Sequence, residues 1–216
     1  MLAITFIGIT LLSLLLFYYA TGSDKRVLYT CSAWLLFIGP IAFTGFFTNT
    51  QSTPPRFMLV MLGATILSVY LYKRTRKLKV NKQLLLAIHI LRLPVELVLY
   101  ELFLQKQIPV LMTFKGWNMD IFMGIIALLL FIYTLVRKKE IPTKLFITWN
   151  YLGICLVTTI FMIGFFSAPF PFQQLAFDQP NRAIALFPFV YLPALVVPLV
   201  YVSHVIVLRE INRERH

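Results

Sequence analysis

Apolar residues occur in seven long runs along the 216-residue chain, and short polar segments separate these runs. Each run is near the length of about 20 residues that an α-helix needs to cross a bilayer. The pattern therefore predicts an all-α, single-domain integral membrane protein over residues 1–216. The predicted membrane helices cover residues 2–20, 27–47, 57–72, 83–104, 119–136, 145–168 and 189–208.

The basic residues predict how these helices are oriented, because positively charged loops stay on the cytoplasmic side of a membrane. Of the 20 Lys and Arg residues, 15 lie in alternate segments and four lie in the opposite loops. No basic residue precedes the first run, whereas Lys25 and Arg26 follow it, which is the reverse of a secretory signal peptide. We therefore expect the N-terminus outside and the C-terminus in the cytoplasm.

Composition agrees with an integral membrane protein. Hydrophobic residues make up 59% of the chain and charged residues 13%, against about 45–50% and about 25% in soluble domains. The net charge of +12 lies in short blocks between apolar runs. Such blocks attract anionic lipids at the cytoplasmic face, and their placement argues against nucleic-acid binding.

Cys31 and Cys155 match no metal or redox spacing and are expected to be small buried residues.

The fourth run, residues 83–104, contains ionisable residues that are costly inside a membrane. At about 100° per residue, four side chains share one face of this helix, namely His89, Arg92, Glu96 and Tyr100. A charged group at membrane depth costs roughly 2.5–3.5 kcal/mol, so such groups usually point inward and are paired. Arg92 and Glu96 are four residues apart, a spacing that allows an ion pair within the helix.

Prolines predict irregularities in two of the helices. Pro94 lies between Arg92 and Glu96, removes one backbone hydrogen bond and frees the carbonyl of Ile90, so a kink that opens a pocket is expected there. Pro193 and Pro198 are expected to bend the seventh helix in the same way.

Other polar residues are expected at a similar depth in neighbouring helices. His89, Asn150 and His204 lie seven, six and five residues from basic residues at the cytoplasmic helix ends. With a rise of about 1.5 Å per residue, their depths agree within about 3 Å. Tyr201 accompanies His204, and Asp120 is expected to cap the helix that begins near residue 119. The alternative is that these polar groups only form hydrogen bonds between helices.

Several kinds of site are disfavoured by the residues present. Every Lys lies in a loop or at a helix end, which excludes a retinal Schiff base. The three histidines form no HxxxH or HExxH pair, so a metal site built on His89, His204 and Glu96 is a minor alternative. Haem ligation by His89 and His204 on facing helices is geometrically allowed. No Ser–His–Asp constellation, phosphate loop or dinucleotide fingerprint is present, which argues against an ordinary hydrolase or ATPase.

Three segments resemble an uncharacterised group of multi-pass bacterial inner-membrane proteins. They are RLPVELVLY, LMTFKGWNMDI and PNRAIALFPFVYLPALVVPLVYVSH, and the resemblance extends over roughly residues 85–205. It implies a bacterial inner-membrane location and no particular activity.

The sequence supports three hypotheses about function. The first is binding or movement of a small molecule or ion through a polar cavity lined by His89, Arg92 and Glu96. Arg92 would hold an anionic group or the Glu96 carboxylate, and His89 or Glu96 would exchange protons. The second is a redox subunit that binds haem through His89 and His204. The third is a non-catalytic scaffold or sensor subunit whose polar face contacts a partner helix.

Overall fold

The computed structural model describes residues 1–215, and this range contains helices and no strand. The all-α prediction is therefore confirmed. The α-helices are α1 (Leu2–Ala20), α2 (Lys25–Phe43), α3 (Met58–Thr75), α4 (Lys82–Ile90), α5 (Arg92–Leu104), α6 (Asp120–Arg137), α7 (Thr143–Phe166) and α8 (Val197–Arg213). Short 3₁₀ turns are η1 (Phe46–Thr48), η2 (Val110–Met112) and η3 (Ala183–Ala185), and η4 (Leu192–Val196) is a π-helical turn.

Within residues 1–215, six helical segments are long and apolar enough to cross a membrane. They are α1, α2, α4 with α5 (Lys82–Leu104), α6, α7 and η4 with α8 (Leu192–Arg213). The third predicted span corresponds to α3, which is not among the six. This helix includes Lys73 and Arg74 in its last turn, and these charges lower its apolar character.

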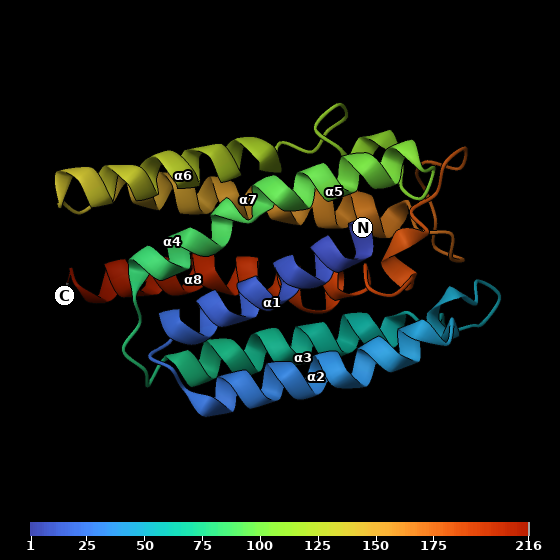
Figure 1. Ribbon diagram of the computed structural model, residues 1–216, viewed down its shortest axis with the longest axis horizontal. Coiled ribbons are helices and arrows are strands. Elements are labelled where there is room, and N and C mark those ends of the chain that lie inside the picture. Colours follow the sequence, from blue (N-terminus) through green and yellow to red (C-terminus); the bar gives the residue numbers. More distant parts are fainter. Residues whose placement is uncertain (216) are drawn as a thin grey trace.

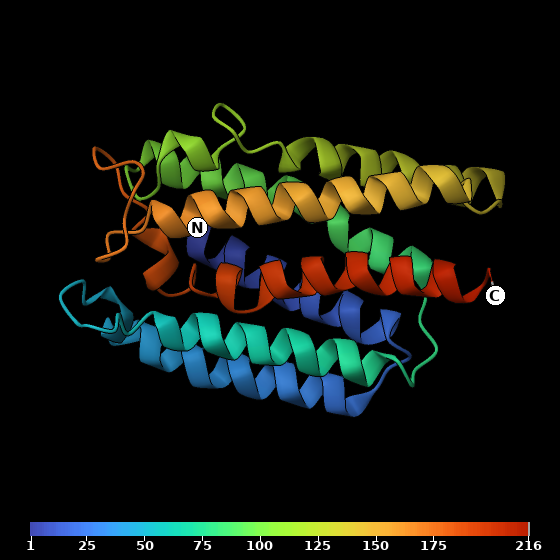
Figure 2. The ribbon, with the colours of Figure 1, turned by 180° about the vertical axis from the view of Figure 1, so that it is seen from behind.

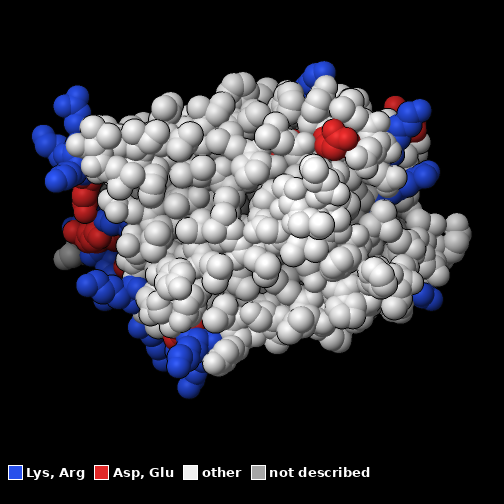
Figure 3. All heavy atoms as spheres, in the orientation of Figure 1, with Lys and Arg blue, Asp and Glu red and all other residues white. Residues whose placement is uncertain are grey.

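The helices run along the length of an elongated bundle (Figure 1). The α2–α3 pair lies on one side and α5, α6 and α7 lie on the other, with α1, α4 and α8 between them (Figures 1 and 2). Lys and Arg side chains gather at the end of the bundle where the C-terminus lies, and the flank shown in Figure 3 is almost free of charge. Large apolar side chains are exposed on the bundle surface, for example Leu36, Leu62 and Val136.

The fourth predicted helix is broken into α4 and α5. Ile90 is the last residue of α4 and Arg92 the first of α5. Pro94 has no N–H to bond the carbonyl of Ile90, and its ring crowds that carbonyl. The kink expected from Pro94 is therefore present, and it displaces His89 from the helix that holds Arg92.

The irregular turn η4 is held by a side chain from α2. Pro198 cannot donate to the carbonyl of Ala194, four residues earlier. The indole Nε1 of Trp34 donates to this carbonyl instead, at 3.0 Å. A side chain at Gly63 of α3 would lie 2.0 Å from the Trp34 ring, so glycine leaves the space that the indole occupies.

The two cysteines differ in environment. Cys31 on α2 is buried, as expected, whereas Cys155 on α7 is exposed. The expectation that both thiols are buried is therefore wrong for Cys155, which lies on the outward face of its helix.

Candidate functional site

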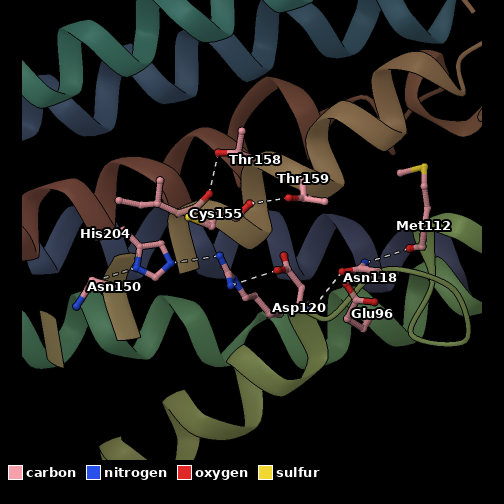
Figure 4. A network of polar contacts seen from close by, with 11 residues as sticks. Glu96, Met112, Asn118, Asp120, Asn150, Cys155, Thr158, Thr159 and His204 are labelled. Atoms are coloured by element: carbon pink, nitrogen blue, oxygen red, sulfur yellow. Dashed lines mark hydrogen bonds and ion pairs between the residues drawn. The ribbon is translucent and has the colours of Figure 1, made fainter. Parts of the chain in front are cut away.

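Arg92 lies at the centre of a group of buried polar side chains from five helices, α4 to α8. Its side chain is 4% exposed. Nη1 lies 3.4 Å from Oδ1 of Asp120 on α6, and Nη2 lies 3.3 Å from Nε2 of His204 on α8. Figure 4 shows His204 and Asp120 within one connected set of contacts. We call this group the polar network, and its members are His89, Arg92, Glu96, Asn118, Asp120, Asn150 and His204.

The hydrogen bonds around His204 define its tautomer. The amide of Asn150 is oriented because its Nδ2 donates to the carbonyl of Phe146 at 2.7 Å. Oδ1 of Asn150 then accepts from Nδ1 of His204 at 2.9 Å. With its proton on Nδ1, a neutral His204 leaves Nε2 free to accept from Arg92.

His89 packs against His204 without a hydrogen bond. The centroids of the two rings lie 4.0 Å apart and their planes differ by 25°. Trp149 contacts His89 edge-on, with 5.1 Å between centroids. Both nitrogens of His89 are buried and have no partner within the described residues. Gly153 leaves the space for His204, because a Cβ there would lie 2.2 Å from two atoms of its ring.

On the other side of Arg92, an asparagine joins the carboxylate of Glu96 to the backbone at the start of α6. Nδ2 of Asn118 donates to Oε1 of Glu96 at 2.6 Å, and Oδ1 of Asn118 accepts from the backbone N–H of Asp120 at 3.0 Å. The expectation that Asp120 caps its helix is therefore wrong. Asn118 provides the side-chain acceptor at this helix start, and the carboxylate of Asp120 turns to Arg92.

The ion pair that the spacing allows within α5 is not the one that Arg92 makes. The ion-pair partner of Arg92 in the described chain is Asp120 rather than Glu96. Oε2 of Glu96 is buried and has no hydrogen-bond partner within residues 1–215. The first turn of α5 therefore directs Arg92 and Glu96 towards different neighbours, α6 with α8 for the arginine and the Asn118 loop for the glutamate.

A small cavity of about 70 Å³ adjoins the carboxylate side of the network. Glu96, Asn118, Asp120 and Asn181 contribute polar side chains to its lining. The rest of the lining is mainly apolar and includes three phenylalanines, Phe57, Phe161 and Phe165. We call this space the Glu96 cavity. It is far smaller than the roughly 300–1,000 Å³ of sites for drug-sized ligands.

Five of the seven predicted site residues lie together in the polar network: His89, Arg92, Glu96, Asn150 and His204. The other two lie elsewhere. Tyr100 receives a hydrogen bond from Lys115 near the loop end of α5, and Tyr201 is 40% exposed on α8. Sequence reasoning missed Asn118 and Asp120 as network members, although two capping-type residues so close together were a signal that one was free for another role.

The residues present do not fit a bis-histidine haem. A porphyrin would have to lie between the two ligating rings, and the stacked rings of His89 and His204 leave no space for it. Among residues 1–215, no group of three His, Cys, Asp or Glu side chains is placed to hold a metal ion.

The fold and the site define a class: a helical-bundle protein with six segments within residues 1–215 that are long and apolar enough to cross a membrane, and with a buried polar network among α4, α5, α6, α7 and α8. The chain belongs to the family described as "Domain of unknown function (DUF8737)", whose model matches residues 56–211. This range includes every member of the polar network. No curated protein and no solved structure matches the chain.

Proposed function

We propose that this protein binds or moves a small molecule or ion through the polar network and exchanges a proton as it does so. In this proposal the chain crosses the inner membrane seven times, with α3 as an additional span beside α2. The N-terminus is outside and the basic end of the bundle is cytoplasmic. The 15-to-four division of Lys and Arg between alternate segments supports this orientation.

The charge balance of the network carries the proposal. Arg92 is its single permanently charged cation, and Glu96 and Asp120 are two carboxylates at the same site. With both carboxylates ionised and both histidines neutral, the network has one negative charge in excess. An unbalanced charge is costly in a dry interior, so the site favours uptake of one proton or one cation.

Two of the three guanidinium nitrogens of Arg92 are already engaged, and Nε is buried with no hydrogen-bond partner within residues 1–215. With both terminal nitrogens occupied, an anionic ligand is the weaker interpretation. The guanidinium of Arg92 contacts Asp120 on one side and His204 on the other. The titratable groups that face Glu96 are Asp120 from α6 and Arg92 from its own helix. The residues of α3, α7 and η4 that line the Glu96 cavity carry no titratable side chain.

A wide cleft approaches the network from the basic end of the bundle. Its volume is about 750 Å³, and Leu86 and Phe146 are part of its lining. Leu86 is one helical turn before His89, and the carbonyl of Phe146 accepts from Asn150. The lining of the cleft is therefore close in the chain to His89 and hydrogen-bonded to Asn150, which supports proton access from that end.

Infrared difference spectroscopy of the protein in lipid vesicles tests the proton exchange. A pH jump is expected to reveal a buried carboxylic acid band that titrates in the wild type. The isosteric change Glu96→Gln replaces the carboxyl group with an amide and removes the excess charge, so this band is expected to disappear. Glu101→Gln is the matched control, because Glu101 lies on the same helix and is exposed. A wild-type protein without such a band, or a band that persists in Glu96→Gln, would contradict the proposal.

A further inference from the structure

We propose that the Glu96 cavity binds the protonated amine of a molecule with an apolar body, and that this molecule enters between α3 and α7. The inference rests on the proposed function and names the class of substrate at the same site.

Two unpartnered oxygen atoms indicate that the ligand is a hydrogen-bond donor. Oε2 of Glu96 and Oδ1 of Asn181 are buried and have no hydrogen-bond partner in the part of the chain that the structure describes. Both residues line the same cavity. The amide of Asn181 is oriented because its Nδ2 donates to the carbonyl of Gly164 at 3.0 Å. Both free atoms are therefore acceptors, and buried acceptors are costly when they remain unpaired.

The charge of the site selects an ammonium group over a neutral donor. The network has two carboxylates and one arginine, so a cation beside Glu96 balances the excess charge. An ammonium group also carries three donors and no acceptor, which matches a site with only free acceptors. A hydroxyl group would supply a donor but no charge.

The remaining lining favours an apolar body attached to this cation. Phe57, Phe161 and Phe165 surround the cavity together with aliphatic side chains. Aromatic faces attract cations and also provide apolar contact area. A volume of about 70 Å³ accommodates the head of such a molecule, and its body would extend outward from the cavity.

The direction of entry follows from the residues at the edge of the cavity. Met61 of α3, together with Phe161 and Phe165 of α7, is half-buried and keeps accessible surface. Figure 2 shows α8 lying between α7 and α3, and η4 continues α8 towards the loops. In the proposal, the entry route lies at this half-buried edge of the cavity between α3 and α7, next to η4. A molecule dissolved in the bilayer would reach Glu96 from this side without passing through water.

Isothermal titration calorimetry in lipid nanodiscs tests this inference with two probes of equal length, octylamine and 1-octanol. Octylamine is expected to saturate a single site in the wild type. Its affinity is expected to fall about tenfold or more in Glu96→Gln, the equivalent of one lost charge interaction. The uncharged 1-octanol is expected to bind the wild type about tenfold more weakly. Glu101→Gln is expected to bind octylamine like the wild type.

A second variant tests the entry route without changing the polar network. Met61→Trp places a larger side chain at the opening and is expected to weaken octylamine binding while the carboxylic acid band is unchanged.

Three results would overturn the inference: equal binding of both probes, undiminished binding of octylamine in Glu96→Gln, or no saturable binding. A titrating carboxyl band together with no octylamine binding would reject the substrate class alone. Octylamine binding without the band would reject proton exchange alone.

Discussion

Two arginine–aspartate pairs join helices in this protein, and their surroundings are very different. Arg74 of α3 contacts Asp24 at the start of α2, at the end of the bundle, and its side chain is 26% exposed. Arg92 of α5 contacts Asp120 of α6 inside the bundle and is 4% exposed. Asp24 also caps α2 by accepting from the N–H groups of Arg26 and Val27, whereas the cap at α6 comes from Asn118.

The difference indicates what each pair contributes. The aspartates of both pairs are 10% exposed, so the difference lies in the arginines. Arg74 keeps partial contact with water, and the outer pair fastens α2 to α3 while it completes a helix cap. The inner pair loses its hydration, and its shortest contact of 3.4 Å is long for an ion pair with hydrogen bonds. A second carboxylate lies beside it. Such an arrangement is a poor way to gain stability, which supports a role in binding and proton exchange.

The largest expected effect comes from removing the cation of the inner pair. Arg92→Ala leaves Asp120 and Glu96 buried without a balancing charge, so the free energy of unfolding is expected to fall by about 3–5 kcal/mol. Thermal unfolding in mild detergent can be followed by the reactivity of the buried Cys31 thiol, in a Cys155→Ser background that removes the exposed thiol.

Two further variants decide whether the loss comes from uncompensated charge. Adding Asp120→Ala to Arg92→Ala removes one of the two stranded carboxylates, so part of the lost stability is expected to return. Arg74→Ala breaks the outer pair and is expected to lower the unfolding temperature much less. If Arg74→Ala and Arg92→Ala have equal effects, the contrast between the two pairs is wrong.

A smaller effect is expected from crowding the histidine that contacts Arg92. In Gly153→Ala, the new Cβ would lie 2.2 Å from atoms of the His204 ring, which is enclosed by other side chains. Displacement of the ring would weaken its contact with Arg92, and we expect a loss of about 1–3 kcal/mol.

Gly164→Ala is the matched control on the same helix. Its Cβ would lie 3.0 Å from Cε of Met112, the flexible end of a side chain that lines the Glu96 cavity. This substitution is expected to be nearly neutral, and unfolding temperatures of both variants measure the contrast. Equal losses would show that the surroundings of His204 and of the Glu96 cavity are packed equally tightly.

Much of the fold follows from the sequence because apolar length and proline position act locally. The all-α class and the interruption before Pro94 are set by residues close together in the chain. Because the rise per residue of a helix is constant, counting residues from the basic helix ends also predicted that His89, Asn150 and His204 lie at a similar depth in the bundle. The structure confirms that these three side chains lie near one another.

The pairing inside the network could not be predicted in the same way. A helical wheel assumes a straight helix and shows which residues share a face, but it does not identify the neighbouring helix. The choice of Asp120 over Glu96 as the partner of Arg92 depends on how α6 packs against α5. Tyr100 shares the predicted face, yet its hydroxyl lies near the loops and contacts Lys115. Asn118 lies in the loop before α6, and the pattern of apolar residues does not predict the shape of this loop.

The smallest expected effect concerns the outer pair and is a dependence on pH. The hydrogen bond from Arg74 holds the pKa of Asp24 below its ordinary value of 3.8. Because the pKa is lower in the folded state, the stabilisation is fully present above that ordinary value and is lost as the pH falls through the folded pKa. Asp24→Asn retains an oxygen that can cap α2 but removes the charge. The unfolding temperature of this variant is therefore expected to fall less than that of the wild type between neutral pH and pH values below about 4.

The control is Asp178→Asn, which changes an exposed aspartate. Its unfolding temperature is expected to depend on pH as that of the wild type does. An identical acid response in Asp24→Asn and the wild type would show that the outer pair contributes nothing through its charge, and the two pairs would then differ only in burial.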